Sequence, residues 1–187
     1  MIITPRSIEG VFEVKSSPLY QDERGSLLRL FDATLFEQQG IRVAWVQQSV
    51  SRTRERNVLR GMHLQRPPFS EAKLVTIISG RMFWAVVDLR RQSATFGQWE
   101  AFTLSPEGVN GFFAARGFAH GCLSLTSDVT LVISADNAYS SEYGTGIRWN
   151  DAELGIEWPL QAGDPVMSAE HRAFPGFSAF KTRYGGI

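Results

Sequence analysis

Two histidines flanked by glycines carry the clearest chemical signal in this sequence. His63 lies in the run Arg60-Gly61-Met62-His63, with Lys73 ten positions later, and His120 lies between Gly117 and Gly121. Histidine titrates close to neutral pH, so a histidine near a lysine and an arginine in one pocket can move protons at physiological pH. This pattern favours an enzyme, with both histidines in turns bounded by glycine.

The composition is that of one folded domain over residues 1–187. The apolar fraction of 43% is enough for a core, and 19 Lys and Arg balance 19 Asp and Glu, so no overall charge favours nucleic acid or an anionic membrane as a partner. The single cysteine, Cys122, excludes an intrachain disulfide and suits a reducing compartment. The first residues lack a signal-peptide pattern and the apolar runs are too short to cross a bilayer, so we expect a cytoplasmic protein.

Short segments rich in valine, isoleucine, phenylalanine and tryptophan, separated by turn residues, fill residues 41–135. This spacing predicts an antiparallel sandwich or barrel. A short helix is expected over Asp32 to Gln39, ended by Gly40, with a hairpin turn at Ser79 to Arg81 and loops, short helices or a frayed tail from Gly163 onward. The predicted strands are Val43–Val50, Lys73–Ser79, Arg81–Asp88, Gln98–Leu104, Asn110–Ala114, His120–Leu125 and Val129–Ala135.

Several blocks along the chain resemble the dTDP-4-dehydrorhamnose 3,5-epimerases, and they stand in the order found in that family. The resemblance implies an all-β cupin jelly-roll barrel with short peripheral helices, a core barrel at about residues 41–135, and a homodimer with strand exchange. It also implies a metal-free enzyme without a cofactor that acts on a nucleotide-linked 4-keto-6-deoxyhexose. The blocks are Asp22–Gly25, Val58–His63, Lys73–Val75, Val87–Arg90, Ser93–Trp99, Gly117–Gly121 and Gly146–Asp151 continuing to Ile156–Pro159.

Epimerisation beside a ketone needs a base, a cation at the enolate oxygen and an acid on the opposite face. By resemblance His63 is the base, Lys73 is the cation and His120 lies in the same pocket. The resemblance implies that the substrate-binding residues are Arg24 and Arg60 at the diphosphate, and Gln47 and Tyr139 near the nucleotide.

A metal centre is not expected. Cupins commonly bind a metal through a His-x-His pair, whereas this chain has His63-Leu64-Gln65, and glutamine is a poor ligand for transition metals.

The chain departs from the family at pocket positions. The family's acidic tyrosine is Ile133, which cannot donate a proton, and the aspartate that pairs with the base is His171, a possible modified dyad partner. Two further family residues, an aspartate and a phenylalanine, are Trp84 and Cys122. Near the nucleotide, the family's asparagine and glutamine are replaced by Ser49 and Glu71.

Three hypotheses remain open. The retained residues favour an epimerase or isomerase that enolises a keto sugar nucleotide, acting at one carbon or both. The substituted residues favour instead a sugar-nucleotide-binding module whose catalytic set has decayed. The apolar side chains of Trp84 and Ile133 are also compatible with keto isomerisation or with another, more apolar substrate.

Overall fold

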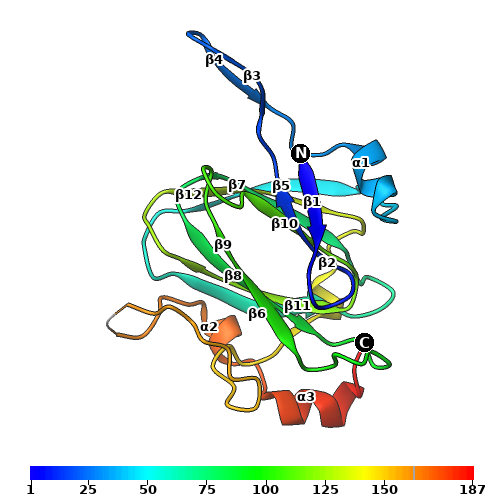
Figure 1. Ribbon diagram of the computed structural model, residues 1–187. Coiled ribbons are helices and arrows are strands. Elements are labelled where there is room, and N and C mark those ends of the chain that lie inside the picture. Colours follow the sequence, from blue (N-terminus) through cyan, green and yellow to red (C-terminus); the bar gives the residue numbers. More distant parts are fainter. Residues whose placement is uncertain (162) are drawn as a thin grey trace.

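Two antiparallel sheets face each other in the computed structural model, which describes residues 1–161 and 163–187 (Figure 1). This arrangement confirms the predicted all-β barrel with few short helices. The six-stranded sheet has the order β1 (Ile2–Pro5), β2 (Val11–Lys15), β10 (Gly111–Ala114), β7 (Lys73–Ser79), β12 (Val129–Ala135) and β5 (Gln47–Thr53). The five-stranded sheet has the order β13 (Gly144–Gly146), β6 (Leu59–Gln65), β11 (Phe118–Ser124), β8 (Met82–Asp88) and β9 (Trp99–Leu104).

The barrel interior and the outer face of the five-stranded sheet are both apolar, as β8 illustrates. All seven residues of β8 are buried. Trp84 and Val86 belong to the cluster between the sheets, whereas Phe83 and Val87 pack in a second cluster with Phe177 of α3 (Phe177–Tyr184). Because successive side chains of a strand point to opposite faces, a strand covered on both sides needs a continuous apolar run. The sequence of β8 meets that need.

The observed strands agree with the sequence predictions in part. Strands β7 and β12 have the predicted bounds, whereas β5 begins at Gln47 instead of Val43. The expectation that His63 and His120 lie in turns was wrong, because they lie within β6 and β11. The hairpin at Gly80 was also wrong, since β7 and β8 belong to different sheets and the turn there connects the two sheets.

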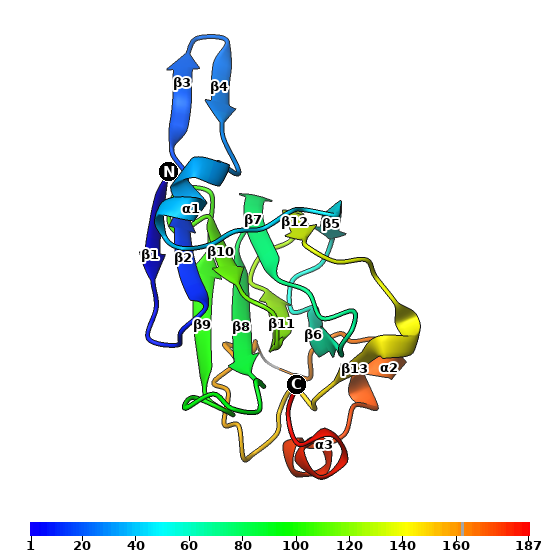
Figure 2. The ribbon, with the colours of Figure 1, turned by 90° about the vertical axis from the view of Figure 1, so that its right-hand side faces the viewer.

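The N-terminal region contributes to the six-stranded sheet and then leaves it. Strands β1 and β2 pair with each other, and β2 pairs with β10. A hairpin of β3 (Pro18–Asp22) and β4 (Gly25–Leu28) then extends away from the barrel (Figure 2). Most of its residues are exposed, so this hairpin has no core of its own in the isolated chain.

The helices are short and lie at the periphery. Asp32 caps α1 (Ala33–Gln38) by accepting hydrogen bonds from the first-turn amides, and Phe36 anchors this helix in the apolar cluster on the outer face of the six-stranded sheet. The tail forms α2 (Ala169–Arg172) and α3, in keeping with the expected short helices, and a single turn η1 (Ser141–Tyr143) precedes β13. No helix in the described ranges is long and apolar enough to cross a membrane.

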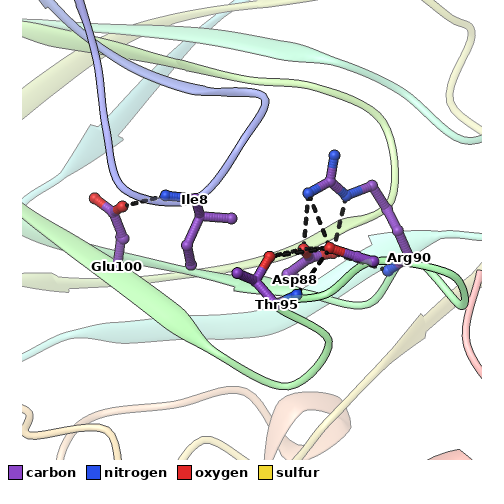
Figure 3. Close-up of polar contacts among 6 residues, drawn as sticks. Ile8, Asp88, Arg90, Thr95 and Glu100 are labelled. Atoms are coloured by element: carbon purple, nitrogen blue, oxygen red, sulfur yellow. Dashed lines mark hydrogen bonds and ion pairs between the residues drawn. The ribbon is translucent and has the colours of Figure 1, made fainter.

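Two buried carboxylates fix the loops at one end of the barrel (Figure 3). Asp88 accepts two side-chain hydrogen bonds from Arg90 and others from the hydroxyls of Ser93 and Thr95. Glu100 accepts from the Ile8 amide at 2.8 Å. Hydrogen bonds to the charged form lower the pKa of both carboxyls although burial opposes the shift. These carboxylates are structural, because their oxygens are satisfied by the protein.

Candidate functional site

The two strand histidines lie side by side on one wall of the barrel. His120 of β11 is the Cα partner of His63 of β6, and Cys122 is the partner of Arg60. Between these two pairs β6 advances by three residues and β11 by two, so β6 has a β-bulge there. Cys122 faces the interior cluster, so the bulge lets Arg60 and His63 share the interior face although they are three positions apart.

The opposite wall carries a buried ion pair. Lys73 begins β7, and its Nζ lies 3.0 Å from a carboxylate oxygen of Glu71. Both residues are more than nine-tenths buried. Strand alternation places them on the same face as Val75, which belongs to the interior cluster. A basic and an acidic side chain thus face His63 from the other sheet.

A cavity of about 230 Å³ separates the two walls. Its residues come from both sheets, from the segment after β12 and from the C-terminal tail. They are His63, Leu64, Gln65, Glu71, Lys73, Tyr139, Gly144, Thr145, Glu170, His171 and Phe174.

His63 is held neutral in this cavity. Burial lowers its pKa well below the ordinary value, and the positive charges of Lys73, His171 and Arg60 act in the same direction. Nδ1 is buried and has no hydrogen-bond partner within the described part of the chain, which leaves Nε2 as the nitrogen that can reach a ligand. A neutral imidazole with a free lone pair can accept a proton.

His120 is also neutral, for a related reason. It is 1% exposed, and its ring lies 6.4 Å from that of Trp84 and 6.3 Å from that of Phe112. Burial lowers its pKa well below the ordinary value, and Lys73 and His63 lower it further. Trp84 supplies no negative charge, so among the described residues nothing favours the imidazolium form of His120.

His171 contacts His63 as a stacked ring. The ring centroids are 5.5 Å apart and the planes differ by 11°. The Nδ1 of His171 accepts a hydrogen bond from the Gly61 amide at 3.1 Å. This lone pair is therefore not available to accept a hydrogen bond from His63. Partial burial lowers the pKa of His171, although Glu170 opposes the shift. His171 therefore steadies the His63 ring, but it does not accept a hydrogen bond from it.

The four expected binding residues have different positions. Gln47 is the Cα partner of Ala135, which is in turn the partner of Lys73, so all three side chains share the interior face. Tyr139 lines the cavity but is 70% exposed. Arg60 donates to the Thr53 hydroxyl at 3.1 Å.

Arg24 does not reach the cavity within one chain. It lies at the tip of the exposed β3–β4 hairpin, where it pairs with Asp22 at 2.6 Å. The structure thus brings together His63, Lys73 and His120, with His171 against them, and leaves Arg24 apart.

Some residues of the cavity were not among the site residues expected from the sequence. The resemblance placed Glu71 near the nucleotide without naming it as a site residue; it stands two positions before Lys73, so strand alternation could have placed it on the same face. Phe174 and Thr145 carry no such local signal, because they reach the cavity from distant segments. Ile133 and Val75 are Cα partners deeper on the Lys73 wall, so that part of the wall is apolar.

Metal ligands are not grouped in this site. Over residues 1–161 and 163–187, no cluster of three or more His, Cys, Asp or Glu side chains has an arrangement that could hold a metal ion. The nearby Cys122 is buried, and burial raises the pKa of its thiol to about 12, so it remains an unreactive thiol.

Comparison with known proteins points to a single family. The family model described as dTDP-4-dehydrorhamnose 3,5-epimerase matches residues 5–179. A curated protein of that name from Methanothermobacter thermautotrophicus is 38% identical over 164 residues, which are 88% of this chain and 87% of that protein.

Solved structures are similar over nearly the whole chain. One is the dTDP-6-deoxy-D-glucose-3,5-epimerase of Legionella pneumophila in complex with dTDP-4-keto-L-rhamnose, with a TM-score of 0.87, 32% identity, and coverage of 97% of this chain and 95% of that one. Another is a 3'-monoepimerase of Streptomyces bikiniensis in complex with dTDP-quinovose, with a TM-score of 0.87, 31% identity, and coverage of 97% and 90%.

Proposed function

This chain belongs to the dTDP-4-dehydrorhamnose 3,5-epimerase family, and we propose that it is an epimerase of a dTDP-linked 4-keto-6-deoxyhexose. The observation that carries the proposal is the placement of neutral His63 and cationic Lys73 on facing walls of one cavity. A ketone bound between these walls has a base on one side and a positive charge at its oxygen.

The proposed reaction begins with proton removal. Nε2 of His63 takes the proton from the carbon beside the ketone, and the electron pair of the C–H bond moves to the carbonyl oxygen. Lys73 stabilises the resulting enolate, because a charge interaction is strong in a cavity from which most water is excluded. His120 is the Cα partner of His63 on the neighbouring strand, and both of its ring nitrogens are buried without a hydrogen-bond partner among the described residues.

The nucleotide part of the substrate is assigned to polar residues around this cavity. Arg60 and Gln47 share the interior face with the catalytic residues, and Tyr139 lines the opening. The guanidinium of Arg60 suits paired diphosphate oxygens. In this proposal Tyr139, which lines the cavity, contacts the nucleotide.

A second copy of the chain completes the site in this proposal. The β3–β4 hairpin has exposed Tyr20 and Leu27 beside Arg24, and it extends away from its own barrel (Figure 2). A homodimer would bury these apolar side chains and bring Arg24 to a diphosphate in the neighbouring barrel. Light scattering coupled to gel filtration tests this, and a monomer at micromolar concentration would contradict it. A cytoplasmic location agrees with the free thiol of Cys122.

The test of the reaction is isotope exchange. Incubation with dTDP-4-keto-6-deoxyglucose in D₂O should incorporate deuterium at C3, C5 or both, as followed by proton NMR, because enolisation exposes the carbon to solvent-derived deuterons. His63→Ala should abolish the exchange. Lys73→Met should slow it by on the order of 100-fold or more, while Lys181→Met on the outer helix α3 serves as the matched control.

The alternative function is a dTDP-sugar-binding module without turnover. It is favoured by one observation, the absence of a hydrogen-bond acceptor at Nδ1 of His63 among the described residues. Calorimetry that shows dTDP-sugar binding, together with no deuterium incorporation at any carbon, would favour the module and refute the epimerase.

A further inference from the structure

Epimerisation needs an acid opposite His63, and the wall that carries Lys73 offers a candidate. We propose that Glu71, supplied with a proton by Lys73, is the acid that protonates the enolate carbon on the face opposite His63. This assignment rests on the epimerase function proposed above and names the residue that makes inversion possible.

The first support is position. Inversion needs the base and the acid on opposite sides of the sugar ring. His63 belongs to β6 of the five-stranded sheet, whereas Glu71 directly precedes β7 of the six-stranded sheet, and both line the same cavity. Glu71 therefore lies on the wall opposite the base.

The second support is the incomplete coordination of the Glu71 carboxylate. Asp88 and Glu100 are buried carboxylates whose oxygens accept several hydrogen bonds from the protein. Glu71 is as buried as Glu100, at 9% and 7% exposed, yet within the described structure its one charged partner is Lys73. A buried carboxylate with spare acceptor sites facing a cavity is arranged for a ligand more than for structure.

The third support is charge balance in the cavity. His63 and His120 both have pKa values well below the ordinary value, so neither is a proton donor in its resting state. The pair of Lys73 and Glu71 carries one exchangeable proton between two atoms 3.0 Å apart. In the resting pair the proton is on Lys73, and its transfer to Glu71 produces a neutral carboxylic acid.

His63 takes the proton from the substrate carbon and becomes imidazolium, while the C–H electron pair forms the enolate. The proton of Lys73 passes to Glu71 and from there to the opposite face of the same carbon, as the enolate electrons form the new C–H bond and the ketone returns. Lys73 is left as a neutral amine and Glu71 as a carboxylate. His63 then gives its proton to water, and water returns one to Lys73.

The experiment separates exchange from inversion on one substrate. Wild type and variants are incubated with dTDP-4-keto-6-deoxyglucose in D₂O. Deuterium incorporation is followed by NMR, and epimers are separated by chromatography after borohydride reduction. Glu71→Gln keeps the size and removes the acid, so the rate of inversion should fall at least 100-fold while exchange falls less than tenfold. Glu71→Asp, which retains a carboxylate one methylene shorter, should recover part of the inversion.

The matched control is Glu170→Gln. Glu170 lines the same cavity and loses the same charge, but it stands on α2 beside His171, on the side of the base. This variant should keep the wild-type ratio of inversion to exchange. Binding of dTDP by calorimetry checks that each variant is folded and retains its nucleotide site.

The outcomes are distinguishable. Inversion by Glu71→Gln at the wild-type rate, or an equal loss of exchange and inversion in that variant, would overturn the role of Glu71 and leave the epimerase function standing. Exchange without any inversion in the wild-type protein would overturn both the role of Glu71 and epimerisation, and would leave only enolisation. Wild type with neither exchange nor inversion would overturn the proposed function and the role of Glu71 with it.

Discussion

Replacing His171 with aspartate should raise the pKa of His63. In the present structure the neighbour of His63 is a stacked imidazole, with ring centroids 5.5 Å apart. A carboxylate there favours the imidazolium form, which is the opposite of the effect that burial and Lys73 have now. The titration of His63 should therefore move toward higher pH.

The magnitude follows from the separation. Two unit charges 5.5 Å apart interact by about 3 kcal/mol at an effective dielectric constant of ~20, which corresponds to on the order of 100-fold in proton affinity. Position 171 is partly exposed, and solvent screening there reduces the expected effect to between about tenfold and 100-fold.

The assay is an NMR titration of the imidazole protons. The chain has three histidines, and the variant has two, so assignment is direct. His171→Asn is the matched control, because it has the shape of aspartate without the charge and should change the His63 titration by less than about threefold. Equal titration of His63 in the two variants, or a shift toward lower pH with aspartate, would refute the argument that His63 lacks a carboxylate partner.

Three further predictions concern stability, measured by urea unfolding. The pKa of His120 is lower in the folded state than in the unfolded state, so the unfolded chain takes up its proton first as the pH falls. The stability that neutral His120 contributes is complete above about pH 6.5 and is lost below that pH by about 1.4 kcal/mol per pH unit. His120→Phe should reduce the slope of unfolding free energy against pH by that amount between about pH 6.5 and 5.5. Asp88→Asn should cost about 3 kcal/mol, because it removes the charge of a buried carboxylate and leaves its half-buried donors poorly paired (Figure 3). Glu153→Gln at an exposed ion pair should cost less than about 1 kcal/mol, and equal losses in the two variants would contradict this account. Gly61→Ala should cost more than about 3 kcal/mol, because a Cβ there would lie 2.2 Å from the carbonyl oxygen of His120. Gly40→Ala, also at positive φ but with open space around it, should cost about 1–2 kcal/mol. Similar losses in the two variants would show that backbone strain alone decides.

Much of the architecture could be predicted from local pattern. Strands β7 and β12 and the helix after Asp32 have the bounds, or nearly the bounds, that alternation and capping indicate. The N-terminal strands of the six-stranded sheet were not predicted. They are short and largely exposed, as β1 is, or they depend on a distant partner, as β2 depends on β10. An apolar pattern identifies a strand only where the strand buries enough side chains to show one.

The sequence by itself determined the family, the all-β class and the residue types available for proton chemistry, because blocks of residues and a strand period of two are local properties. The tertiary structure decided which of those residues meet. The bulge in β6 puts Arg60 and His63 on one face, and the second sheet brings Glu71 and Lys73 to the opposite wall. The tail stacks the ring of His171 on that of His63, where it makes no hydrogen bond to His63. These contacts join segments far apart in the chain, so they depend on pairing and packing across the whole barrel, which no local pattern specifies.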